Sequence, residues 1–275
     1  MSYITGEMVQ RALAGMQEFH SSQISLHDRF DMDFMDNPCR RNIIMSAAQE
    51  SFFAREIGRV LEGVVADGRT GQADIYIGQL DRELECKMTS PIGDRGAIQL
   101  QTDHETLVNK GKLDYLYVIA SSKFDEFCVL FFEGLAPDDF RKPSANARGK
   151  VPMIKSKGMQ KCTVLWGRVE THIDRARNRL EEEISNCEMR LGEELVEIEK
   201  RLTKLEDALE RDADPETGVP LRAKRRGALR KMRARLLTRP DRICRQTEEK
   251  IQKIRESLEK TLEWTPRYSF ILHPS

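Results

Sequence analysis

The chain lacks any apolar run that approaches the roughly 20 residues needed to span a membrane. We therefore expect no membrane partner. The N-terminal stretch carries Glu7, Arg11 and Glu18, and these charges do not suit the apolar core of a signal peptide. Neither a membrane span nor an export signal is predicted from the sequence.

Paired cysteines and net charge are missing as well. The six cysteines, at positions 39, 86, 128, 162, 187 and 244, include no C-x-x-C pair, and several stand inside apolar patterns typical of buried thiols. This usage favours a reduced, cytoplasmic protein. Lysine and arginine total 45, as do aspartate and glutamate. The formal net charge of zero therefore argues neither for nor against nucleic acid as a partner.

The most informative stretch is residues 71–87, with the sequence GQADIYIGQLDRELECK. It predicts a strand, a turn and a second strand. Aliphatic and aromatic residues at 73–77 predict a short strand, and residues 78–81 supply turn chemistry. Residues 82–88 predict the strand that returns beside it.

At 275 residues the whole chain has room for one large domain or two smaller ones.

Polar side chains gather on this predicted hairpin. Because side chains alternate across a strand, Glu85 and Lys87 share one face, whereas Leu84 and Cys86 share the other. Asp74 begins the hairpin, so two carboxylates and one amine should come together. Carboxylates and backbone carbonyls are the ligands that hard divalent cations prefer. We expect Asp74, Glu85 and the carbonyl of Cys86 to bind a metal ion, with Lys87 next to the attacking water.

This pattern resembles the PD-(D/E)XK nuclease superfamily, which covers restriction endonucleases, junction resolvases and repair nucleases. Asp74 matches the first acid, in an Ala-Asp context in place of the nominal Pro-Asp, and Glu85-Cys86-Lys87 matches the second half of the motif. The resemblance covers about residues 42–135. It implies an α/β fold with a mixed sheet flanked by helices, a Mg²⁺ cofactor that Mn²⁺ can replace, and an acidic residue on the preceding helix.

Residues 42–62 predict that helix, because apolar residues recur there at helical spacing. With 100° per residue, Glu50 falls near the centre of the apolar stripe and Glu56 falls well away from it. A carboxylate on an apolar stripe needs a partner such as a metal or Lys87. Glu50 is therefore the expected helix acid and Glu56 the alternative. A solvent-exposed Glu50 at the helix edge is the simpler interpretation.

Further elements follow the lysine strand. An irregular passage at 89–96 leads to a predicted helix at 96–109, where Gln99 and Gln101 are candidates for phosphate contact and for orienting the water. Residues 113–120 and 127–132 are nearly continuous apolar runs, typical of central strands covered on both faces. At the N-terminus, residues 5–20 predict a helix and residues 21–37 a polar loop.

Residues 141–161 contain seven lysines and arginines and no acid. Such a segment is suited to holding phosphates, although an ordinary solvated loop explains it equally well. The predicted contacts here are Lys142, Arg148, Lys150, Lys155 and Lys157.

Residues 167–265 predict a long antiparallel coiled-coil hairpin, since leucine and isoleucine recur at spacings of three and four on both sides of a break at 212–220. Pro240 should bend or interrupt the second arm. We expect a nuclease core over 1–166, with 266–275 returning to its sheet as a last strand.

Charge is divided unevenly between the predicted arms. Residues 221–245 hold eleven lysines and arginines and one acid, whereas the first arm is rich in glutamate. The cations either pair along the seam, contact DNA from outward positions, or support dimerisation through the hairpin. The predicted DNA contacts on this arm are Arg222, Arg225, Arg226, Arg230 and Arg233.

Together these features favour a magnesium-dependent endonuclease that cuts double-stranded DNA. A type II restriction endonuclease acting as a homodimer is the leading hypothesis, because a two-fold enzyme matches a palindromic site. One alternative is a structure-selective repair or junction nuclease. The other is a non-enzymatic coiled-coil scaffold that binds nucleic acid, in which Asp74 and Glu85 are solvated strand residues.

Overall fold

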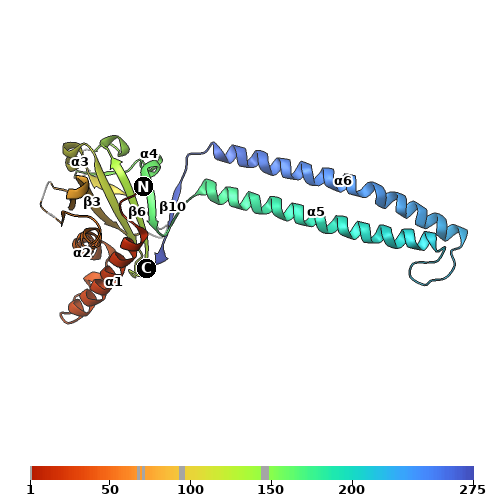
Figure 1. Ribbon diagram of the computed structural model, residues 1–275, viewed down its shortest axis with the longest axis horizontal. Helices are drawn as coiled ribbons and strands as arrows, with labels where there is room; N and C mark the ends of the chain where they lie inside the picture. Colours follow the sequence, from red (N-terminus) through yellow and green to blue (C-terminus); the bar gives the residue numbers. More distant parts are fainter. Residues whose placement is uncertain (1, 67–68, 70–71, 93–96, 144–148) are drawn as a thin grey trace. The chain divides into compact units, whose positions relative to one another are not determined.

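The computed structural model describes residues 2–66, 69, 72–92, 97–143 and 149–275. The chain divides into two compact units, Met1–Glu170 with Tyr268–Ser275, and Thr171–Arg267. The first unit is a mixed α/β domain and the second is a helical hairpin (Figure 1). The units change over within four residues of the predicted boundaries at 166 and 266.

A seven-stranded mixed sheet forms the centre of the first unit. The strands run in the order β1-β2-β3-β5-β6-β11, and β8 also pairs with β6. Only the pairing of β3 with β5 is parallel. The strands are β1 (Val64–Ala66), β2 (Ile75–Ile77), β3 (Arg82–Thr89), β5 (Leu113–Ala120), β6 (Glu126–Leu135), β8 (Cys162–Trp166) and β11 (His273–Pro274).

Two long helices cover one face of the sheet: α1 (Gly6–Asp28) and α2 (Pro38–Gly58). They pack on alternate residues of β5, including Leu116 and Val118. Tyr115 and Tyr117 of the same strand belong to the core on the opposite face. Every residue of β5 is buried, as its nearly continuous apolar sequence predicts for a strand covered on both faces.

Smaller elements build that opposite face. The strands β4 (Gln101–Asp103) and β7 (Lys150–Pro152) form a separate two-stranded sheet. The helix predicted for 96–109 begins only at His104, because Asp103 accepts a hydrogen bond from the N–H of Thr106 and so caps the helix start. The remaining helical segments are α3 (His104–Lys110), α4 (Lys155–Gly158) and the short 3₁₀ turns η1 (Phe34–Asp36), η2 (Gly78–Leu80), η3 (Pro137–Asp139) and η4 (Met159–Lys161).

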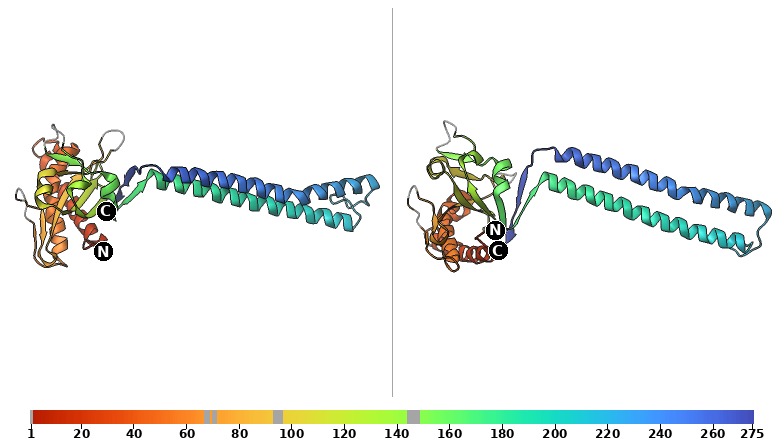
Figure 2. Two further views of the ribbon diagram at one scale, coloured as in Figure 1. Left: turned by 90° about the horizontal axis from the view of Figure 1, so that it is seen from above. Right: turned by 45° about the horizontal axis from the view of Figure 1, so that its top comes forward.

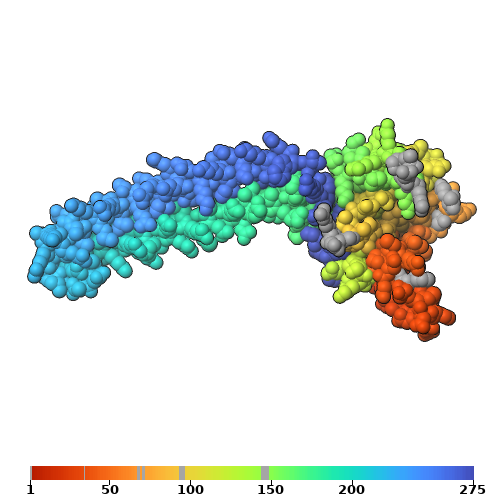
Figure 3. All heavy atoms as spheres, turned by 180° about the vertical axis from the view of Figure 1, so that it is seen from behind, coloured from red at the N-terminus to blue at the C-terminus, as the bar shows by residue number. Residues whose placement is uncertain are grey.

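The second unit consists of α5 (His172–Glu210) and α6 (Ala223–Leu262), which lie side by side along their length (Figure 2, Figure 3). Leucine and isoleucine residues of both helices form their shared core. Pro240 was expected to bend or interrupt the second arm; it does not interrupt it, since α6 continues through Pro240 as one helix. The two ends of the hairpin join β9 (Arg168–Thr171), which precedes α5, and β10 (Tyr268–Ile271), which follows α6. These two strands pair with each other. The chain then returns to the main sheet through β11.

No helix among the described residues is long and apolar enough to cross a membrane.

Candidate functional site

The site begins where two strands separate. β2 pairs with β3 only as far as Ile75 opposite Leu84, whereas β3 continues to Thr89. From there, β3 has no neighbouring strand on its β2 side within the described residues. Asp74, the residue before β2, lies at this gap, and its Oδ2 accepts a hydrogen bond of 2.7 Å from the backbone N–H of Cys86. The carboxylate therefore satisfies a strand-edge donor that β2 leaves open.

Glu85 and Lys87 share the face of β3 that the alternation predicts. The Nζ atom of Lys87 lies 2.5 Å from Oε1 of Glu85. Leu84 and Cys86 lie in the core on the other face. Glu85 is only 7% exposed, and its second oxygen, Oε2, is buried without a hydrogen-bond partner among the described residues. A buried carboxylate oxygen without a partner is costly unless a cation or donor joins it.

Helix α2 contributes Glu50, which lines one cleft together with Asp74 and Lys87. Burial, reinforced by the charge of Asp74, raises the pKa of Glu50 to about 7, although Lys87 acts in the opposite direction. Burial also raises the pKa values of Asp74 and Glu85 above their usual range, and Lys87 limits both shifts. Three carboxyl groups that resist ionisation together form a site that favours a bound cation.

Lys87 behaves differently from a buried lysine without partners. Burial by itself would lower its pKa, but the adjacent carboxylate of Glu85 and the charge of Asp74 raise the pKa of Lys87 above its ordinary value. The side chain is therefore an ammonium group at neutral pH. It can donate hydrogen bonds and stabilise negative charge, but it is not poised to act as a base.

Glu50, Asp74 and Lys87 line a cleft of about 660 Å³, whereas Glu85 is buried beside Lys87 and is not part of the lining. Asn42, Ser46 and Glu50 line one wall at intervals of four residues along α2, and Lys150 of β7 also contributes. The complete lining is Pro38, Cys39, Asn42, Ile43, Ser46, Glu50, Asp74, Cys86, Lys87, Met88, Thr89, Ser90, Pro91, Ile92 and Lys150.

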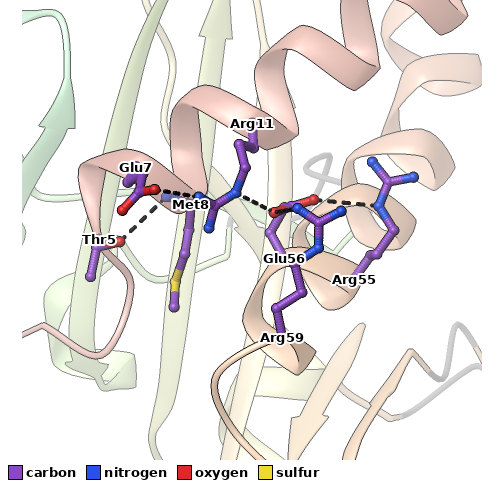
Figure 4. Close-up of polar contacts among 7 residues, drawn as sticks. All are labelled: Thr5, Glu7, Met8, Arg11, Arg55, Glu56 and Arg59. Carbon is purple, nitrogen blue, oxygen red and sulfur yellow. Dashed lines mark hydrogen bonds and ion pairs between the residues drawn. The ribbon is translucent and has the colours of Figure 1, made fainter.

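Glu56, the alternative helix acid, does not line this cleft. The expectation that it lies away from the buried side of α2 is wrong, because Glu56 is only 1% exposed. Its carboxylate binds Arg11 of α1 at 2.7 Å, Arg59 at 2.8 Å and Arg55 at 3.4 Å (Figure 4). The sequence pattern could not show that a second helix, α1, covers this side of α2. Glu56 therefore joins two helices.

The donor set fits a hard cation in part. The N–H and C=O of one strand residue point to the same side, so the carbonyl of Cys86 faces the open edge beside Asp74. That carbonyl, Asp74 and the free Oε2 of Glu85 are oxygen donors of the kind that Mg²⁺ takes together with water and phosphate oxygens. Within the described ranges, no group of three or more His, Cys, Asp or Glu side chains is arranged to hold a metal by itself.

The residues predicted to contact DNA from the core unit are more scattered. Gln99 and Gln101 precede α3 and bond to each other at 2.8 Å. Lys155 is committed elsewhere, because its Nζ donates to the carbonyl of Ile98 at 2.9 Å and lies over the ring of Phe270. Among the other predicted contacts, Lys142 is exposed, Lys150 lines the cleft, Lys157 donates to the carbonyl of Asp138 at 3.3 Å, and Arg148 is outside the described residues.

On the hairpin, three of the five predicted arginines pair with acids. Arg225 pairs with Asp214 at 3.0 Å, Arg226 with Asp212, and Arg233 with Glu206 at 2.7 Å. Arg233 thus pairs across the seam with α5, as one alternative expects, whereas Arg225 and Arg226 pair with acids of the connection between the two helices. Arg222 and Arg230 are exposed.

A second group of cations has no such partners. With Leu229 at zero and about 100° per residue, the three paired arginines lie within about 60° of the buried stripe. Lys224, Lys231, Arg235 and Arg242 lie at about 200–240°, are exposed, and form no ion pair within the described part of the hairpin. The outward basic face of α6 consists of these four residues.

The sequence-based prediction did not include Asn42, Ser46 and Ser90, which line the cleft. Their spacing in the sequence could have identified them. Asn42, Ser46 and Glu50 repeat every four residues, which places all three on one side of α2. Ser90 follows Lys87 by three positions and so falls on the α2 side of the strand. Asn42 and Ser90 line the cleft together with Glu50 and Asp74.

No known protein-family model, curated protein or solved structure matches this chain. The case for its function therefore depends on the geometry of the site.

Proposed function

We propose that this protein is a metal-dependent endonuclease of the PD-(D/E)XK type that hydrolyses phosphodiester bonds in double-stranded DNA. The observation that carries the proposal is the arrangement at the open edge of β3. There the carboxylate of Asp74 is fixed by the N–H of Cys86, next to a Glu85–Lys87 pair with one unsatisfied carboxylate oxygen. An accidental match of the motif would not require these side chains to meet.

Asp74, Glu85 and the carbonyl of Cys86 would hold Mg²⁺ or Mn²⁺. When bound, such an ion supplies Lewis acidity and lowers the pKa of water. The ammonium group of Lys87 stabilises negative charge that develops on the phosphate oxygens. Glu50 has a pKa of about 7, so it can accept the proton that the attacking water loses. The water oxygen bonds to phosphorus, one phosphorus–oxygen bond to a sugar breaks, and the sugar oxygen takes a proton from solvent.

We further propose a type II restriction endonuclease that works as a homodimer, because the two strands of a duplex run in opposite directions and one cleft serves one strand. The outward basic face of α6 would hold DNA phosphates, since its cations are not neutralised within the hairpin.

Incubation of the purified protein with plasmid DNA and Mg²⁺ tests this proposal. Discrete fragments are the expected result. Cutting confined to branched or damaged DNA would instead indicate a repair or junction nuclease. Intact DNA of every kind would contradict nuclease activity and favour a scaffold that only binds nucleic acid.

A further inference from the structure

In the first turn of α2, Arg41 is a buried arginine that has no acidic partner among the residues the structure describes. Arg41 has no exposed surface. Its Nη1 atom donates to the carbonyl of Ser122, and its Nη2 atom donates to Oγ of Ser90 at 2.8 Å and to Oδ1 of Asn42 at 3.3 Å. Its guanidinium carbon lies 5.1 Å from the centre of the Phe124 ring. All of these partners are neutral, and the buried Nε atom has no hydrogen-bond partner in the described part of the chain.

The electrostatics agree with the contacts. Burial lowers the pKa of Arg41, and no acid offsets this effect. The charge of Arg41 adds to the effect of burial in lowering the pKa of His20. A buried cation without a counter-charge is unfavourable. An anion that comes near Arg41 would therefore be bound with a gain in free energy.

Ser90 and Asn42 connect this charge to the cleft, which both of them line. Oγ of Ser90 accepts hydrogen bonds from Arg41 at 2.8 Å and from Nδ2 of Asn42 at 3.1 Å. Among the described residues, the acceptor for the Ser90 hydroxyl proton is Oδ1 of Asn42, at a long distance of 3.4 Å. A hydroxyl that accepts from a guanidinium is polarised, so it donates more strongly to an anion.

We propose that Arg41, Asn42 and Ser90 form a subsite that binds a phosphate group of the DNA strand in the cleft. The choice of DNA as the ligand rests on the proposed function. Ser90 follows Lys87 by three residues, or about 10 Å along a strand. Because Lys87 and Ser90 both line the cleft, a DNA strand that enters it can place one phosphate beside Lys87 and another near Ser90. Because Asp74, Glu85 and Glu50 repel anions in the absence of metal, this subsite also gives the strand a point of attachment outside the carboxylate cluster.

A purely structural role accounts for only part of these contacts. The bond from Nη1 of Arg41 to Ser122 ties α2 to the turn between β5 and β6. That role does not require Nη2 to bond to a serine that lines the cleft, nor a serine hydroxyl whose proton lacks a close acceptor.

The test compares Ser90→Ala with Ser46→Ala. Ser46 lines the same cleft, but its hydroxyl already donates to the carbonyl of Ile43 at 2.8 Å. Binding of a short DNA duplex is measured by fluorescence anisotropy in EDTA, so that no cleavage occurs. Ser90→Ala should weaken binding about tenfold, the loss expected for one hydrogen bond to a charged group. Ser46→Ala should stay within about twofold of the wild type.

Asn42→Asp keeps the test meaningful if Ser90→Ala folds poorly. The new carboxylate supplies Arg41 with a counter-charge inside the protein, so the melting temperature should rise while DNA affinity falls at least as far as in Ser90→Ala. Wild-type affinity in folded Ser90→Ala and Asn42→Asp proteins would overturn the subsite, as would a wild type that does not bind DNA.

Cleavage kinetics separate this proposal from the nuclease proposal. With Mg²⁺, Ser90→Ala should raise KM and leave kcat within about twofold, since it removes binding made equally in the ground and transition states. Binding that depends on Ser90 without any cleavage would leave the subsite standing and refute the nuclease. Cleavage with an unchanged KM in Ser90→Ala would refute the subsite alone.

Discussion

The backbone N–H of Cys86 donates a 2.7 Å hydrogen bond to the carboxylate of Asp74 at the point where β2 leaves β3. This bond joins two residues twelve positions apart and fixes the carboxylate beside Glu85. It also accounts for the position of the site, because β2 stops pairing at Leu84 and leaves the N–H and carbonyl of Cys86 at an open strand edge that Asp74 can reach. The predictions below depend on that arrangement.

Lys87→Ala should lower the rate of DNA cleavage at least about 10²-fold, because it removes a charged donor from the reacting phosphate. DNA binding should be retained. Lys110→Ala is the matched control, since Lys110 pairs with Glu83 of the same strand at 2.6 Å but does not line the cleft. Equal cleavage by wild type and Lys87→Ala would contradict the role given to Lys87.

The raised pKa of Glu50 should make the stability of the protein depend on pH. Its pKa is raised from 4.5 to about 7, so its contribution to stability is fully present below pH 4.5 and is lost as the pH rises through about 7. The melting temperature of the metal-free protein should therefore fall between pH 5 and pH 8 by more than that of Glu50→Gln. Mg²⁺ should reduce this difference, because a cation stabilises the ionised carboxylate. If the melting temperature falls with pH by the same amount with and without Mg²⁺, no cation binds beside Glu50.

Glu56→Gln should reduce stability and leave the chemistry of the cleft unchanged. The loss should be about 2–4 °C in melting temperature, because Gln cannot neutralise Arg11, Arg55 and Arg59. Burial would raise the pKa of Glu56, but the hydrogen bond from Arg11 and the neighbouring charges hold it below its ordinary value. The stabilisation is thus present above pH 4.5 and is lost as the pH falls through the lowered pKa. A difference that persists unchanged at lower pH would exclude this explanation.

The outward basic face of α6 can be tested by salt dependence. Substituting Lys224, Lys231, Arg235 and Arg242 with glutamine should weaken DNA binding. It should also flatten the plot of log affinity against log salt by about 0.9 for each lost phosphate contact. The measurement is a series of binding titrations at increasing salt concentration.

The control for that series replaces Arg225, Arg226 and Arg233, which pair with acids of the hairpin. It should change the salt slope by less than about one unit. Circular dichroism verifies that both variants keep their helices. If the control flattens the plot as much as the four-residue variant does, the outward face has no special role.

Much of the architecture follows from hydrophobic pattern. The buried run of β5 and the repeats of α5 and α6 are long and regular, so the sequence predicts them well. The shared face of Glu85 and Lys87 follows from strand alternation. The prediction of a helix over 96–109 was wrong in its first half. There the buried residues Ile98 and Leu100 alternate with exposed or partly exposed residues, which is the pattern of an extended segment.

Contacts between distant segments could not be predicted. The helical pattern of α2 identifies the side that packs on the sheet, but it contains no information about α1, so the burial of Glu56 by Arg11 was missed. The contact of Asp74 with Cys86 depends on where β2 stops pairing, which is set by packing between segments far apart in the chain. The division of the α6 cations into paired and outward sets likewise needs the position of α5.

Plasmid cleavage by wild-type and Asp74→Asn proteins, with Mg²⁺ and with EDTA, tests whether Asp74 holds the metal ion of a nuclease. Asparagine keeps an oxygen that can accept the Cys86 N–H and removes the charge that a cation needs. The account predicts discrete fragments from the wild type with Mg²⁺, and intact plasmid with EDTA or with Asp74→Asn. Equal cleavage by both proteins, or none by the wild type with Mg²⁺, would contradict it.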